Sequence, residues 1–188
     1  ILLIITRPFT VLFHELGHAI PVMLLTKNGA TIYVGSYGDK KYSFKISFAG
    51  LTIWFRYNPI KWHGGLCIPN ATDISLNKRI IYIICGPLFS LLIATLLFYV
   101  TFSLDLHGSI KLICAFALGS TSLDLFGNLI PGEIRLPDGS TLQNDGYHII
   151  NIQKLKKFPK EYSNAIDLYE KKEYEKTANL FESFIDRQ

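Results

Sequence analysis

Three long apolar runs, separated by polar segments, dominate the pattern along this 188-residue chain. The stretch 80–102 carries no charged residue, and about 20 consecutive apolar residues suffice to cross the hydrocarbon core of a bilayer. We therefore predict three transmembrane helices, the first within residues 1–26, the second at 79–102 and the third at 110–130. A short polar loop joins the last two.

The first apolar run is interrupted by Arg7 and Pro8. Because proline is tolerated in the first turn of a helix, we expect the continuous helix to begin near Pro8 and to end at about Thr26. Asn28-Gly29 is a stop signal at that point. A helix of this length is short for a span unless the residues before Arg7 also lie in the membrane.

After the first run the pattern changes to short segments rich in β-branched and aromatic residues, which is typical of strands. These segments are 31–35, 42–48 and 51–57, and Ala49-Gly50 separates the last two. We predict a small β-hairpin or meander here. Residues 58–78 are rich in Pro, Gly, Asn and Asp, and we expect an irregular connection.

The chain turns polar after the third run. Residues 131–146 are predicted to be irregular, and a short helix is expected at about 146–155. Helical periodicity with many lysines and glutamates then predicts two soluble helices in 161–188, joined near Lys172. This pair resembles a tetratricopeptide-type repeat, and an amphipathic helix pair without that kinship fits equally well, because one repeat cannot bury its own face.

The predicted fold class is a mainly α membrane protein with a membrane-embedded domain at 1–153 and a soluble helical tail at 154–188. Charged residues make up only 18% of the chain, against about 25% in soluble proteins. The net charge of +4 is spread out and does not indicate a nucleic-acid partner. Lysines and arginines gather in 27–79 and 131–188, which the positive-inside rule places in the cytoplasm.

Two further features of the sequence bear on its setting. The three cysteines lack CxxC spacing, so we expect neither a disulfide framework nor a cysteine metal site. The missing initiator methionine and the abrupt C-terminus suggest a segment of a longer protein.

An HExxH motif, His14-Glu15-Leu16-Gly17-His18, lies inside the first apolar run. Two histidines at i and i+4 share one helical face and are close enough to bind one ion. Zinc binds imidazole well and lowers the pKa of a bound water to roughly 7, and Glu15 is placed to take that proton and pass it to the leaving amine. Helix-surface histidines could show the same pattern, but ionisable residues at membrane depth are costly and usually functional.

A catalytic zinc site needs a third protein ligand, which must come from a distant segment. Asn144-Asp145-Gly146 is predicted to lie on the same side of the membrane as the HExxH motif. Asp145 would supply a carboxylate oxygen, and Gly146 would permit a close backbone approach. Asp138 and His148 are alternative third ligands, although Asp138 also fits a turn.

Four motifs in this order resemble the site-2 protease family of intramembrane zinc metalloproteases, and the small size resembles its compact bacterial branch. They are FHELGHA from Phe13, CGPLFSLL from Cys85, FGNLIP from Phe126 and NDGYHI from Asn144, and they cover most of residues 9–150. The resemblance implies that His14, His18 and Asp145 are the zinc ligands and that Glu15 is the general base. The chain departs from the family in the polar insertion at 132–143, and in Asn144 where leucine is commoner.

The same resemblance implies roles outside the ligand set. Asn128 and Pro131 match an Asn-Pro element of the family, so Asn128 is expected to hydrogen-bond the substrate backbone, unless it only caps a helix. Gly86-Pro87 is implied to pack near the site, where a simple kink would also explain it. Independently of the resemblance, Asp124 needs a partner in its apolar surroundings, and we expect a structural hydrogen bond to a neighbouring helix.

The sequence thus predicts a multi-pass integral protein, of a bacterial inner membrane, with its active site towards the cytoplasm. We expect an endopeptidase that binds one zinc ion and cleaves transmembrane protein substrates within the lipid bilayer, with a tail available to a protein partner. The segment 31–57 could bind an unwound substrate by β-addition or could be a structural hairpin. The alternative function is a non-catalytic membrane scaffold that retains the metalloprotease fold. A soluble metalloprotease is disfavoured by the uncharged length of the second run.

Overall fold

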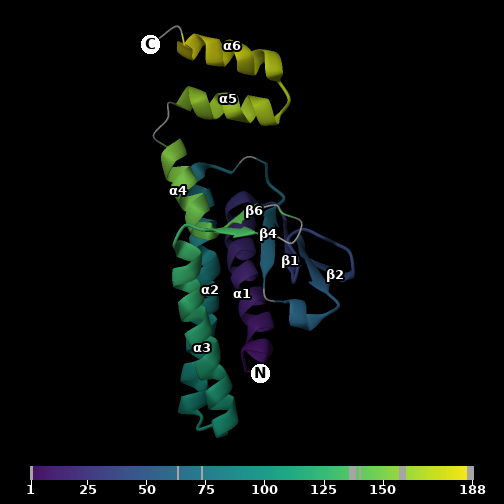
Figure 1. Ribbon diagram of the computed structural model, residues 1–188, viewed down its shortest axis with the longest axis vertical. Helices are drawn as coiled ribbons and strands as arrows, with labels where there is room; N and C mark the ends of the chain where they lie inside the picture. The colour runs from purple at the N-terminus through teal and green to yellow at the C-terminus, as the bar shows by residue number, and fades with distance from the viewer. Residues whose placement is uncertain are drawn as a thin grey trace. The chain divides into compact units, whose positions relative to one another are not determined.

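The computed structural model describes residues 2–62, 64–72, 74–135, 139, 141–156 and 160–185. Helices dominate it, and small sheets follow the first and third long helices (Figure 1). The elements in chain order are α1 (Leu2–Thr26), β1 (Ala30–Val34), β2 (Ser43–Phe48), β3 (Leu51–Arg56), η1 (Pro59–Lys61), β4 (Gly65–Pro69), α2 (Leu76–Ser103), α3 (Gly108–Leu129), β5 (Glu133–Arg135), β6 (Thr141–Gln143), α4 (Asp145–Leu155), α5 (Lys160–Glu170) and α6 (Tyr174–Ile185). They form two compact units, Ile1–His148 and Ile149–Gln188.

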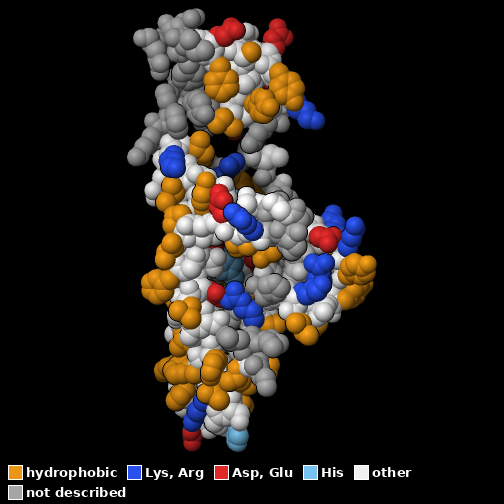
Figure 2. Space-filling model, in the orientation of Figure 1, with side chains coloured by type: hydrophobic (Ala, Val, Ile, Leu, Met, Phe, Trp, Pro, Cys, Tyr) orange, Lys and Arg blue, Asp and Glu red, His pale blue; other side chains and the backbone are white. Residues whose placement is uncertain are grey.

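Three helices, α1, α2 and α3, are long and apolar enough to cross a membrane, as the hydrophobic pattern predicts. Large apolar side chains on α2 and α3 point outward, among them Leu92 and Leu123, which are 62% and 75% exposed. Figure 2 shows such side chains covering the end of the molecule where α2 and α3 meet. This outer surface is the kind that lipid would cover.

The first helix begins earlier than expected. We predicted a start near Pro8, but α1 is helical from Leu2 and includes both Pro8 and Pro21. A proline removes one N–H donor and still fits helical φ angles, so the turn before it can remain helical. The Thr10 hydroxyl donates to the Arg7 carbonyl oxygen at 3.0 Å in this same turn. The additional residues give α1 the length of a full span.

An ion pair joins α1 to α3. Arg7 donates to the carboxylate of Asp124 from the neighbouring helix, and both side chains are partly buried. The expectation that Asp124 hydrogen-bonds an adjacent helix is therefore confirmed.

The first sheet has four strands in the order β2-β3-β1-β4. The predicted hairpin is present, because β2 and β3 pair antiparallel around Ala49-Gly50, where both residues have positive φ, as a tight two-residue turn requires. A simple meander is wrong, however, because β1 pairs parallel with β3 rather than antiparallel with β2. The connection from β1 to β2 passes the position of β3, so β1 lies inside the sheet, between β3 and β4.

Two segments expected to be irregular contain strands. β4 lies within 58–78 and pairs antiparallel with β1 at the sheet edge, and β5 and β6 form a two-stranded sheet within 131–146. β4 has the sequence Gly-Leu-Cys-Ile-Pro, so its ends carry the two residues that usually mark turns. Proline is compatible with an edge strand because its missing donor faces away from the partner strand.

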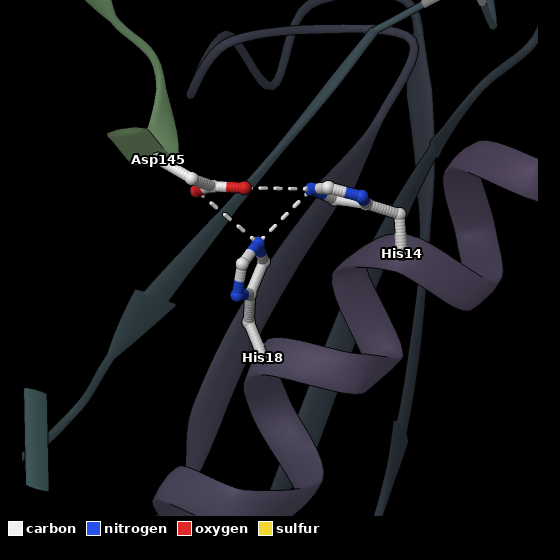
Figure 3. Close-up of side chains that lie close together, drawn as sticks. All are labelled: His14, His18 and Asp145. Carbon is white, nitrogen blue, oxygen red and sulfur yellow. Dashed lines mark hydrogen bonds and ion pairs between the residues drawn. The ribbon is translucent and has the colours of Figure 1, made fainter. Parts of the chain in front are cut away.

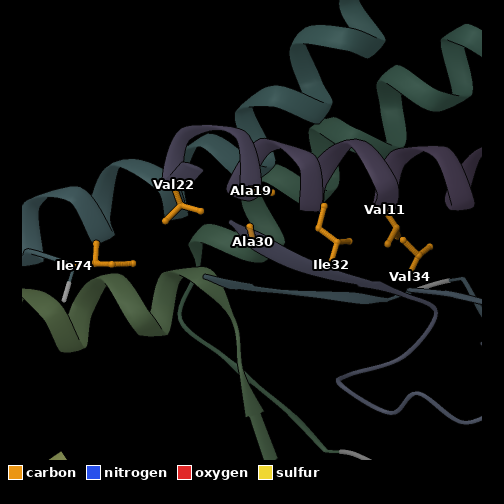
Figure 4. Packing of buried hydrophobic residues seen from close by; sticks show 7 residues of the cluster. All are labelled: Val11, Ala19, Val22, Ala30, Ile32, Val34 and Ile74. Carbon is orange, nitrogen blue, oxygen red and sulfur yellow. The ribbon is translucent and has the colours of Figure 1, made fainter. Parts of the chain in front are cut away.

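The core of this unit is the contact between α1 and the sheet. Val11, Ala19 and Val22 of α1 pack on Ala30, Ile32 and Val34 of β1, with Ile74 at one end (Figure 4). All three β1 side chains are fully buried. The sheet therefore packs against the part of α1 that contains the HExxH motif.

The second unit is the helical tail. α5 and α6 form an antiparallel pair, and the turn between them contains Lys172 with positive φ, at the position where the join was predicted. Ala165 and Thr177 are buried between the two helices, and Tyr169 and Tyr174 pack edge to face at 5.5 Å between ring centroids.

Candidate metal centre

Three side chains from two distant segments converge on one point. His14 and His18 lie one turn apart on α1, and Asp145 is the first residue of α4 (Figure 3). The two Nε2 atoms are 3.1 Å apart. The Asp145 carboxylate oxygens lie 3.3 Å from Nε2 of His14 and 3.5 Å from Nε2 of His18. Among the described residues these three form a group that could hold a metal ion.

The separations suit a small tetrahedral cation. Bonds of about 2.0–2.2 Å to nitrogen and oxygen place the ligand atoms of zinc roughly 3.3–3.6 Å apart, close to the three distances observed. The Oδ2 atom of Asp145 is buried, and apart from the imidazole of His14 at 3.3 Å it has no partner. A buried carboxylate oxygen with so few partners calls for an explanation, and a bound cation would supply one. The donor set therefore fits the zinc ion that the sequence predicts.

The charge state of Asp145 also suits a cation. Burial by itself would raise the pKa of this carboxyl, but its contacts and charge interactions with His14 and His18 outweigh burial and hold the pKa below its usual range. The carboxylate form is the one that binds a metal.

The orientation of His18 is fixed from the far side of its ring. Its Nδ1 atom lies 2.9 Å from the backbone carbonyl oxygen of Tyr82 in α2. A carbonyl can only accept, so Nδ1 carries a proton and donates it, and Nε2 is the ring nitrogen that faces Asp145 and His14. Outer partners of this kind usually set the tautomer and ring orientation of histidine ligands.

Glycines allow α2 to approach this closely. A Cβ on Gly86 would overlap the imidazole of His18, and a Cβ on Gly17 would lie 2.6 Å from the carbonyl oxygen of Cys85. At either position a larger residue would therefore push α1 and α2 apart, because the atoms that its Cβ meets belong to the backbone or to a packed ring. Gly86 thus packs directly against a candidate ligand, and α2 continues as a helix through Pro87.

Glu15 is buried and faces the edge strand β4. A Cβ on Gly65 would lie 2.7 Å from Oε1 of Glu15, so the backbone of β4 lies against the carboxylate. Burial and the carboxylates of Glu15 and Asp145 raise the pKa of the Cys67 thiol in the same strand. Sequence reasoning did not foresee this strand, and its turn-like composition gave no signal for it.

Asn144 fixes the position of Asp145. Its Oδ1 accepts from the backbone N–H of Gly132 at 2.9 Å and from that of Tyr147 at 3.0 Å. Its Nδ2 donates to the carbonyl oxygens of Gly127 at 3.1 Å and Ile130 at 2.7 Å. The side chain thus caps α4 and ties it to the end of α3, with all four of its hydrogen-bonding positions used. Asn144 therefore has a structural role beside the candidate ligand Asp145.

The other predicted site residues have different surroundings. Asn128 donates from Nδ2 to the backbone carbonyl of Asp124 at 2.9 Å, and its role in substrate binding stays a prediction. His148 is exposed on α4 and is not in the ligand group. Asp138 lies outside the described residues.

Comparisons with known proteins give no relative for the chain: no family model, no curated protein and no solved structure matches it.

Proposed function

We propose that this chain is a zinc-dependent endopeptidase that works inside a membrane, as in the site-2 protease family that its motifs resemble. One observation carries the proposal. A carboxylate 127 positions after the second histidine of HExxH meets both imidazoles at ligand distances, and its Oδ2 atom is buried without any other partner. A chance HExxH sequence would not be expected to lie at ligand distance from an aspartate so far along the chain.

The membrane setting is supported by the three apolar helices and their outward side chains. Three of the four ionisable residues of α1 have partners in that setting. Arg7 is paired with Asp124, and His14 and His18 face Asp145. Charged groups at membrane depth are usually paired or functional, and Glu15 is the one to which the proposal gives a catalytic role.

In this proposal His14, His18 and Asp145 hold one zinc ion. Bound zinc would polarise a peptide carbonyl and lower the pKa of water to roughly 7. Glu15, the neighbour of His14 on α1, takes the proton from the attacking water and gives it to the leaving amide nitrogen. Because β4 covers one side of the Glu15 carboxylate, the proton is kept from bulk water on that side.

The free edge of β4 is the proposed binding place for an unwound substrate segment. Bonds from Gly35 N–H to the Gly64 carbonyl and from Asn70 N–H to the Gly29 carbonyl mark the paired positions at the two ends of the β1–β4 ladder. Antiparallel pairing alternates, so the N–H groups of Gly65 and Cys67 point away from β1. Within the described residues no strand pairs with this edge. An extended peptide added here would run beside Glu15.

The decisive experiment replaces the proposed base alone. Glu15→Gln should abolish cleavage of transmembrane segments in proteoliposomes, with new termini read by mass spectrometry, while the protein still binds about one zinc per chain. Glu175→Gln, on the exposed face of α6, is the matched control and should cleave like the wild type. Cleavage that survives Glu15→Gln would refute the mechanism. Zinc binding without any cleavage by the wild type would instead favour the scaffold alternative.

A further inference from the structure

The third long helix leads to the segment that carries Asp145, but it packs only lightly on the rest of the molecule. In α3 only Thr121 is buried, whereas α2 has six buried residues. The Thr121 hydroxyl bonds to carbonyl oxygens of its own helix, so it makes no polar link to another one. Apolar surface gives helices in lipid little drive to associate, because lipid chains are equally apolar. Polar contacts between helices therefore matter more for α3 than for α2.

Arg7 and Asp124 supply such a contact. Among the residues that the structure describes, theirs is the only hydrogen bond or ion pair that joins α1 to α3. Arg7 lies about two helical turns before His14, so both are on the same face of α1, roughly 10 Å apart along its axis. Asp124 lies near the end of α3, which is at Leu129. The pair thus joins the last turns of α3 to the face of α1 that carries the histidines.

The same end of α3 holds the start of α4. Asn144 donates to two carbonyl oxygens there. A Cβ on Gly146 would lie 2.2 Å from the carbonyl oxygen of Leu129, so the backbone of α4 also packs directly on this end of α3. Asp145 lies between these two contact residues. Its position relative to α1 is therefore set through α3.

We propose that Arg7 and Asp124 are positioning residues for the third candidate ligand, Asp145. Their ion pair holds α3 against α1, and α3 brings the start of α4 to the two histidines. These links form a ring from α1 through α3 and α4 back to α1. Neither residue of the pair belongs to the ligand group itself. The inference rests on the metal centre of the proposed function and does not require proteolysis.

The test measures metal binding by the full chain in detergent micelles. Arg7→Gln combined with Asp124→Asn removes the ion pair and leaves no unpaired charge at membrane depth. Zinc affinity, measured by competition with a chromophoric chelator, should fall about tenfold, the lower end of the effect known for partners of metal ligands. Cobalt(II) bound in place of zinc should lose the strong visible absorption of a tetrahedral site, because water replaces the Asp145 carboxylate. Asp105→Asn, which removes the ion pair with Lys111 at the other end of α3, is the matched control and should change neither readout.

Two further variants separate positioning from other effects of the pair. Arg7→Asp combined with Asp124→Arg restores the link with its charges exchanged, so zinc affinity should return to within about threefold of the wild type. A through-space effect of either charge on the metal would not be restored in this way. In an Asn144→Leu background, loss of the pair should lower zinc affinity by less than about twofold more, because the link through which the pair acts is already broken.

Several results would overturn the inference while the metal centre stands. They are unchanged zinc affinity and cobalt absorption without the pair, effects of the pair and of Asn144 that simply multiply, or an exchanged pair that binds zinc as weakly as no pair. A variant without the pair that does not fold, judged by circular dichroism and gel filtration, would make the pair a requirement of the fold instead and would also overturn it. A wild-type chain that binds no zinc would refute the proposed metal centre, and this inference with it.

Discussion

Replacing Asn144 by leucine, the residue commoner in the family that the motifs resemble, should weaken zinc binding although Asn144 is not a ligand. The change removes four hydrogen bonds that hold the start of α4 against the end of α3. At a net value of about 0.5–1.5 kcal/mol each, their loss costs roughly 2–6 kcal/mol of local stability. Changes to the partners of metal ligands lower metal affinity about 10- to 100-fold, which corresponds to about 1.4–2.7 kcal/mol. The two ranges overlap at about 2–2.7 kcal/mol.

The assay is a competitive titration of zinc against a chromophoric chelator. Asn144→Asp keeps the acceptor that caps α4 and loses both donors, so its affinity should fall between those of the wild type and Asn144→Leu. Asn164→Leu, an exposed position on α5, is the control and should bind zinc like the wild type. If Asn144→Leu bound zinc within twofold of the wild type, Asp145 would be positioned by other contacts and the reasoning would be wrong.

Two further changes test the surroundings of the site. Gly86→Ala adds a methyl group that overlaps the imidazole of His18, so zinc affinity measured by the same titration should fall at least about tenfold. Gly119→Ala on α3 is the control, because a Cβ there meets nothing within 4 Å, and it should leave zinc affinity unchanged. Cys67→Pro removes an N–H from the free edge of β4. We expect kcat/KM for cleavage to fall about fivefold with zinc affinity intact, since one hydrogen bond is worth about 1 kcal/mol. Cys67→Val keeps that donor and is the control, and equal kcat/KM for the two variants would exclude β-addition at this edge.

The elements that sequence could predict are those whose signal is local. An uncharged run long enough to cross a bilayer identifies α2 within three residues at each end, and the i, i+4 spacing of His14 and His18 needs only a helix to put both on one face. The join near Lys172 is equally local. Asp145 was harder to predict, because the turn signal at Asp138 and the resemblance favoured it as third ligand while no local pattern excluded Asp138 or His148.

What could not be predicted depends on contacts between distant segments. β4 is a strand because β1 offers it a partner, whereas its own sequence begins with glycine and ends with proline. The contact of Gly65 with Glu15 follows from that pairing, and so was not foreseen. The bond from His18 to Tyr82 uses a backbone carbonyl, which every residue possesses and which no sequence pattern can mark.

The division of the ligands between α1 and α4 has a consequence for the timing of synthesis. His14, Glu15 and His18 leave the ribosome among the first residues described here, and Asp145 follows only after α2 and α3 have been made. Under the proposed function, a half-built chain therefore holds the two imidazoles and the proposed base without the carboxylate that completes the set. Such a chain would stay inactive towards neighbouring proteins until α3 is finished and Asp145 has reached the two histidines.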